Sequence, residues 1–162
     1  SHSIAFRGLT ALFGHMGVEL DPVKESAEEQ AGFAHFIALH KQLRPLLHSG
    51  KVIRIDHHDP AMMINGVIAA DQTEAVFLIS QLAMPTYSLS GSLRLPGLQA
   101  DSNYRLTVLE KPARFDGGVM KTQPQWLTQD ETILSGEWLA KVGIALPVMD
   151  PESAVLLQFK LV

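Results

Sequence analysis

The sequence contains no cysteine, which excludes disulfide bonds and thiolate metal sites and leaves the redox compartment undetermined. Positive charge is scarce as well: 13 Lys and Arg stand against 17 Asp and Glu, and the basic residues do not cluster. A nucleic-acid-binding surface is therefore not expected. The apolar runs are short, the longest being residues 75–79 and 154–157, so the sequence predicts no membrane-spanning segment.

A basic segment followed by an apolar stretch is also missing from the first residues. No signal peptide is therefore predicted, and we expect a cytoplasmic protein. What is present is a globular composition, with 46% hydrophobic and 19% charged residues in a chain of 162. That length suits one domain, or one domain with a fragment of another.

Residues 1 to about 50 have helical character. Ser26 and Glu29 fit a capping box, in which Ser26 is the N-cap of a helix. Pro45 is expected to end or kink that helix, because proline lacks a backbone N–H and crowds the preceding turn. One helical face is predicted to carry Phe33, Phe36, Ile37, His40, Leu43 and Leu47.

After Gly50 the hydrophobic period changes to two, which is typical of strands. Turn dipeptides such as Asn65-Gly66 separate the alternating segments. The pattern predicts a mainly β fold, an antiparallel β-sandwich over residues 51–162, with a short helix inside it at 136–143. Its strands are expected at residues 51–55, 73–82, 104–109 and 154–162.

The conspicuous polar cluster is His57-His58-Asp59, which is either a metal site or, as we favour, a solvated loop. Adjacent histidines on a strand would point to opposite faces and bind one ion poorly. Trp126 and Trp138 either stack on sugars or, as we favour, belong to the core or an interface. No nucleophile elbow or dinucleotide fingerprint is found, so composition and spacing alone predict no chemistry and no cofactor.

Several segments, taken in order along the chain, resemble the C-terminal part of glycoside hydrolase family 36 α-galactosidases. Residues 6–22, FRGLTALFGHMGVELDP, are similar to the end of the family's catalytic barrel. The resemblance continues through KQLRPLLHSG, RLPGL, LSGEWL and GIALP, at residues 41–50, 94–98, 134–139 and 143–147. Gln99-Ala100 replaces the aspartate that usually follows the second of these motifs.

The resemblance implies that residues 1–50 are the last β/α unit of a (β/α)8 barrel and that residues 51–162 are the C-terminal β-sandwich. Residues 9–13 would be the last barrel strand, and the loop after it would lie on the catalytic face. Gly14 and Gly17 would there let the backbone approach the sugar. They are the predicted substrate-binding residues, and two ordinary turn glycines are the alternative.

The family's catalytic aspartates lie in K-W-D-x-N-R and W-x-S-D motifs, and neither occurs in this sequence. No catalytic residue and no metal ligand is therefore predicted here. The resemblance implies a parent enzyme that hydrolyses terminal α-galactosides, of the raffinose or melibiose type, with retention. This part would cap and stabilise the missing barrel and contribute to homo-oligomer contacts.

Two other functions remain open: an independent carbohydrate-binding module and a scaffold for oligomer assembly. Residues 51–162 are expected to form the stable core. A barrel strand at residues 9–13 would lose both neighbours in this chain, leaving its backbone groups without partners. We therefore expect the first 20 residues to be disordered, to become helical against the helix at 26–47, or to dock on a second copy.

Overall fold

The structure is a computed structural model that describes residues 2–19, 21, 23–87, 91–112 and 123–162. Two helices come first, α1 (Ile4–Leu12) and α2 (Ala27–Ser49). They are followed by a six-stranded antiparallel sheet in the order β1-β2-β3-β8-β5-β6. Its strands are β1 (Lys51–Ile55), β2 (Met62–Ile68), β3 (Glu74–Gln81), β5 (Asn103–Glu110), β6 (Thr132–Ser135) and β8 (Ser153–Leu161). The predicted mainly antiparallel β fold after a helical start is confirmed.

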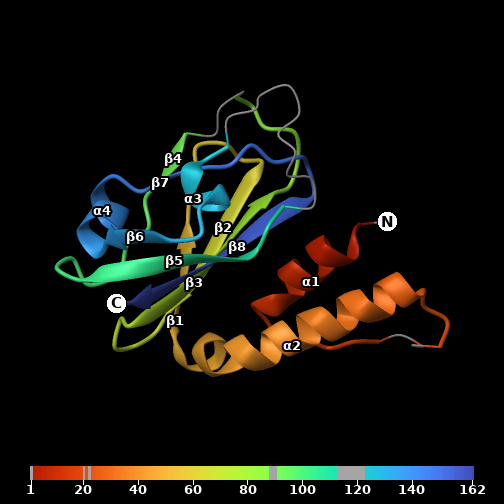
Figure 1. The fold of residues 1–162 in the computed structure, drawn as a ribbon. Coiled ribbons are helices and arrows are strands. Elements are labelled where there is room, and N and C mark those ends of the chain that lie inside the picture. Colours follow the sequence, from red (N-terminus) through yellow and green to blue (C-terminus); the bar gives the residue numbers. More distant parts are fainter. Residues whose placement is uncertain (1, 20, 22, 88–90, 113–122) are drawn as a thin grey trace.

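Each face of the sheet has its own core, because side chains alternate between the faces along every strand. α1 and α2 cover one face, and the other is covered by a smaller layer (Figure 1). That layer holds a two-stranded sheet with two short helices, so the second sheet of the sandwich is small. Its elements are β4 (Ser92–Leu93), β7 (Ile144–Ala145), α3 (Gln125–Thr128) and α4 (Gly136–Lys141), the last of which was predicted.

The segment that the resemblance assigns to the last barrel strand is helix α1 in this chain, so the expected loss of the strand is confirmed. Ser3 caps this helix by accepting the backbone N–H of Phe6 at 3.2 Å. Leu9 and Leu12, three residues apart, are both buried against α2 and the sheet. A helix satisfies its backbone groups internally and needs no neighbouring strands. Of the three expected outcomes for this segment, the structure has the helical one (Figure 1).

Helix α2 begins as predicted, since the Ser26 hydroxyl accepts the backbone N–H of Glu29 at 3.2 Å. It does not end near Pro45 but continues to Ser49. The missing N–H at Pro45 leaves only the carbonyl of Lys41 without its helical partner, and Lys41 is exposed, where water can bond to that carbonyl. The last turn also buries Leu46 and Leu47, which holds it in place.

The dipeptide Asn65-Gly66, predicted to be a turn, lies in the middle of β2. Gly66 pairs with Phe77 of β3 across the sheet. A Cβ at Gly66 would lie 2.5 Å from the Phe77 ring, so this strand position has room for glycine alone. Glycine is needed here because a side chain of the neighbouring strand lies close. Local sequence does not distinguish such a glycine from one in a turn.

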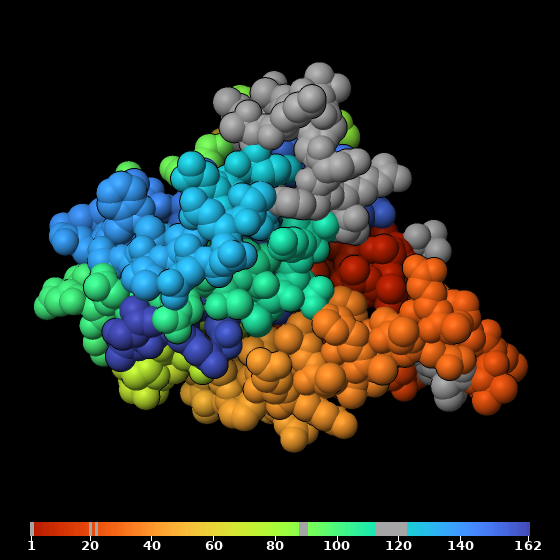
Figure 2. Space-filling view, in the orientation of Figure 1, coloured from red at the N-terminus to blue at the C-terminus, as the bar shows by residue number. Residues whose placement is uncertain are grey.

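Helices α1 and α2 approach each other closely through two glycines. A Cβ at Gly8 of α1 would lie 2.4 Å from the Phe36 ring of α2, and one at Gly32 of α2 would lie 2.6 Å from the Ile4 side chain of α1. The two helices therefore form a compact pair, whose buried side chains also pack on the sheet. In Figure 2, α1 lies between α2 and the sheet domain.

Candidate functional site

Gly14 and Gly17, the predicted substrate-binding residues, lie in the segment that joins α1 to α2. Both are exposed. A Cβ at Gly17 would have nothing within 4 Å, and one at Gly14 would meet only the carbonyl of Ala11 at 4.0 Å. Neither residue has a positive φ. The described residues thus give no internal reason for glycine at either position.

Gly17 borders a hollow of about 200 Å³ between the two helices and their connection, which we call the helix-pair hollow. Among the described residues that line it, Arg7 alone is charged, with its guanidinium 5.5 Å from the Phe33 ring centroid and 3.8 Å from the Glu29 carboxylate. Most of the described lining is apolar, so the hollow suits apolar side chains. Its lining is Ile4, Arg7, Gly8, Ala11, Met16, Gly17, Val18, Phe33, Phe36 and Ile37.

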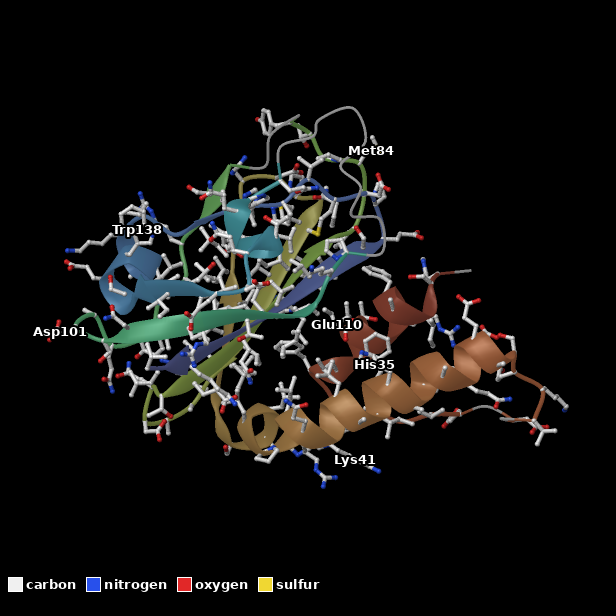
Figure 3. All side chains as sticks on the ribbon, in the orientation of Figure 1. His35, Lys41, Met84, Asp101, Glu110 and Trp138 are labelled. Carbon is white, nitrogen blue, oxygen red and sulfur yellow. The ribbon has the colours of Figure 1, made fainter. Side chains whose placement is uncertain are left out.

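Two polar contacts hold the helix pair in place, one to the sheet and one between the two helices. His35 of α2 forms an ion pair with Glu110 at the end of β5, where the two side chains point toward each other (Figure 3). His40 Nδ1 lies 3.3 Å from the carbonyl oxygen of Leu12, at the end of α1. His40 is half-buried, and its prediction as a hydrogen-bonded core residue is confirmed. Both histidines therefore contribute to the packing of the helix pair.

The cluster His57-His58-Asp59 is only partly the solvated loop that we favoured. Asp59 is 3% exposed and accepts hydrogen bonds from the backbone N–H of Ala61 at 3.0 Å and of Thr86 at 2.8 Å. The N–H groups of Ala61 and Thr86, together with the Thr86 hydroxyl, hold the pKa of the Asp59 carboxyl below its usual value. Asp59 is thus a buried residue that joins two loops through hydrogen bonds, and we call it the latch.

The rings of His57 and His58 do not point to opposite faces, since their centroids lie 4.1 Å apart. They follow the end of β1, so the alternation of a strand does not apply to them. Across the described ranges, no group of three or more His, Asp or Glu side chains is placed to hold a metal ion.

No helix in the described part is long and apolar enough to cross a membrane.

The two tryptophans have different environments. Trp126 is buried and donates its indole N–H to the carbonyl of Ala145 at 2.9 Å, as expected for a core residue. Trp138 on α4 is half-exposed, although its indole N–H is bonded to the carbonyl of Gly143 at 3.1 Å. An exposed aromatic that the sequence analysis passed over is Tyr87, whose ring lies 5.4 Å from that of His58. Nothing in the local sequence marks it, because its position depends on Asp59.

Comparison with known proteins identifies the family of this chain. Residues 60–159 match the model of the glycosyl hydrolase family 36 C-terminal domain. An α-galactosidase of Escherichia coli is 52% identical over 160 residues, which are 96% of this chain and 22% of that protein. A probable α-galactosidase of Aspergillus terreus is 33% identical over 97 residues, 57% of this chain and 13% of that protein.

Solved structures agree on the fold. A family 36 α-galactosidase of Geobacillus stearothermophilus superposes with a TM-score of 0.75 at 23% identity, over 100% of this chain and 20% of its own. The α-galactosidase of Lactobacillus brevis gives 0.74 at 22% identity, over 96% of this chain and 20% of its own. The chain thus spans about a fifth of these proteins, including the E. coli one at 22%. By sequence, this chain belongs to the glycosyl hydrolase family 36 C-terminal domain family, and its homologues are α-galactosidases.

Proposed function

We propose that this chain is the C-terminal, non-catalytic part of an α-galactosidase that hydrolyses terminal α-galactosides with retention. The observation that carries the proposal is the 52% identity over 96% of this chain with a protein of which it covers only 22%. The relatives from Geobacillus stearothermophilus include structures with raffinose and with stachyose, so raffinose-type galactosides are the proposed substrates. The chain's own role is to cap and stabilise the catalytic barrel and to support homo-oligomer contacts.

The helix-pair hollow is the surface proposed to meet that barrel. Its apolar lining is open to solvent in this chain. Val18 is 44% exposed and Val23 is 88% exposed, both in the connection between the helices. Apolar side chains left wet in this way lose roughly 1.5–3 kcal/mol each relative to full burial, which a covering barrel would recover. Gly14 and Gly17 would then let that partner, or the sugar it holds, approach the backbone.

A chimera tests the proposal. The E. coli α-galactosidase is truncated to remove the region that this chain matches, and this chain is fused in its place. We expect the chimera to hydrolyse an aryl α-galactoside, while the truncated enzyme and the isolated chain do not. Hydrolysis by the isolated chain, or a truncated enzyme as active as the intact one, would overturn the proposal. So would an inactive chimera that unfolds cooperatively like the parent.

A further inference from the structure

Three aromatic rings from two distant loops lie in a row at one end of the sheet. The centroids of His57 and His58 are 4.1 Å apart, and those of His58 and Tyr87 are 5.4 Å apart. The histidines follow β1, and Tyr87 follows β3. We call His57, His58 and Tyr87 the ring row. Neither the cap function nor the helix-pair hollow uses it.

Asp59 holds the ring row in place from both sides. Its carboxylate accepts the backbone N–H of Thr86 at 2.8 Å and the Thr86 hydroxyl at 3.1 Å, which fixes the residue before Tyr87. Its own backbone N–H donates to His57 Nδ1 at 3.1 Å, which orients the first ring. Because Asp59 is buried, these bonds are partly shielded from water, which strengthens them relative to fully exposed ones. The position of the His57 ring and that of the backbone before Tyr87 are therefore set by the fold.

Two of the three rings nevertheless face solvent. Tyr87 is 55% exposed, and His58 is exposed. Asp59 thus fixes the His57 ring and the residue before Tyr87, while the rings of His58 and Tyr87 stay outside the core. An exposed aromatic ring, beside groups that donate and accept hydrogen bonds, is the chemistry that recognises a sugar.

Galactose fits this arrangement. Its axial ring hydroxyl leaves several C–H groups together on one face, which can stack on the Tyr87 phenol ring. The tilt of 49° between the Tyr87 and His58 rings places a hydrogen-bonding imidazole beside a sugar stacked there. A protein partner is less well matched, because two rings offer far less than the roughly 800 Å² per partner of a specific interface.

We propose that the ring row is a surface site for the galactose end of an oligosaccharide, with Tyr87 as the stacking residue and His58 as its hydrogen-bonding neighbour. The choice of sugar rests on the proposed function, since the parent enzyme acts on galactosides. The site would hold saccharide near the enzyme without taking part in hydrolysis.

Binding of raffinose to the full chain tests this site, with sucrose as the matched sugar that lacks galactose. Saturation-transfer NMR and calorimetric titration are expected to detect raffinose and not sucrose. Tyr87→Ala is expected to weaken raffinose binding about tenfold, the loss of one stacking contact, and His58→Ala is expected to weaken it less. Trp138→Ala removes another exposed aromatic, which Figure 3 shows far from Met84 of the Tyr87 loop, and should change nothing.

Equal binding of raffinose and sucrose, or raffinose affinity unchanged in Tyr87→Ala, would overturn the site. Circular dichroism of each variant confirms that its fold is kept. A fall in oligomeric mass on Tyr87→Ala, with no raffinose binding in the wild type, would identify a protein contact and also overturn it. The chimera with Tyr87→Ala should keep its hydrolysis of an aryl α-galactoside, so failure of the sugar site is distinguishable from failure of the cap function.

Discussion

At the scale of single residues, glycines that look alike in the sequence have different roles. Gly8 lies in a helix against the ring of Phe36, whereas Gly17 lies in an open connection with no atom within 4 Å of a would-be Cβ. Only the first has its size dictated by the fold of this chain. At Gly17, a need for glycine would come from a partner that covers the helix-pair hollow.

Gly8→Ala is therefore expected to destabilise the chain although alanine is the better helix former. The helix preference for alanine is worth about 1 kcal/mol. The new Cβ, however, would lie 2.4 Å from the Phe36 ring, which is buried and cannot move aside. Overpacking of this kind costs roughly 1–3 kcal/mol, and more where the backbone must shift. We expect a net loss of about 1 kcal/mol, measured by urea unfolding.

Two matched variants control this experiment. Gly17→Ala should stay within roughly 0.5 kcal/mol of the wild type, as other unhindered surface changes do. Gly32→Ala meets the side chain of Ile4, which can turn aside, so its loss should be smaller than that of Gly8→Ala. Equal stability of all three variants would show that the helix pair is looser than the structure has it.

Asp59 predicts an acid sensitivity whose direction follows from its hydrogen bonds. Its pKa in the folded chain is lowered from an ordinary value of 3.8, chiefly by the N–H groups that it accepts. A carboxyl with a lowered pKa stabilises the folded chain. That stabilisation is complete at a pH above the ordinary pKa and is lost as the pH falls through the lowered pKa. The melting temperature of the wild type should fall below about pH 4, and that of Asp59→Asn should be lower at pH 7 but fall less. Parallel curves for the two proteins would contradict this role.

At the scale of elements, the sequence predicts most reliably those features that depend on neighbours along the chain. The cap at Ser26 and the strand from Lys51 to Ile55 are where the local pattern puts them. The pattern fails where a distant contact decides, since Gly66 is a strand residue because of Phe77. The latch at Asp59 was missed for the same reason, since its partner Thr86 is 27 residues away. The helical character predicted for the first 50 residues holds for α1, whereas the strand at residues 9–13 was implied by the resemblance alone.

The capping contact of α2 can be tested by itself. Ser26→Ala leaves the N–H of Glu29 without its acceptor and should cost about 1 kcal/mol. Ser49→Ala removes a hydroxyl bond to the carbonyl of Pro45 at the other, exposed end and should cost less than half as much. Helical circular dichroism and urea unfolding measure both variants. A larger loss at Ser49 would mean that the turn after Pro45, and not the cap, holds the helix.

At the scale of the whole molecule, the two faces of the sheet belong to two hydrophobic cores, and each core depends on a different segment of the chain. The core under α3 and α4 is closed by residues after position 90. The other is closed by α1 and α2, so it depends on the segment that resembles the end of a barrel. The chain can thus be stable in its β part and still present an unfinished apolar surface on its helical side, the condition expected of a domain that caps another.

Removing residues 1–20 should turn that condition into self-association. Leu9 and Leu12 are almost fully buried, and without them part of the sheet face and of α2 becomes wet. The lost burial amounts to roughly 1.5–3 kcal/mol for each leucine, which a second copy can partly recover by covering the same surface. Light scattering over a range of concentrations should show a higher mean mass for the truncated chain than for the full chain, with a lower melting temperature at the lowest concentration. A truncated chain that keeps the mass and melting temperature of the full one would show that α1 closes no core.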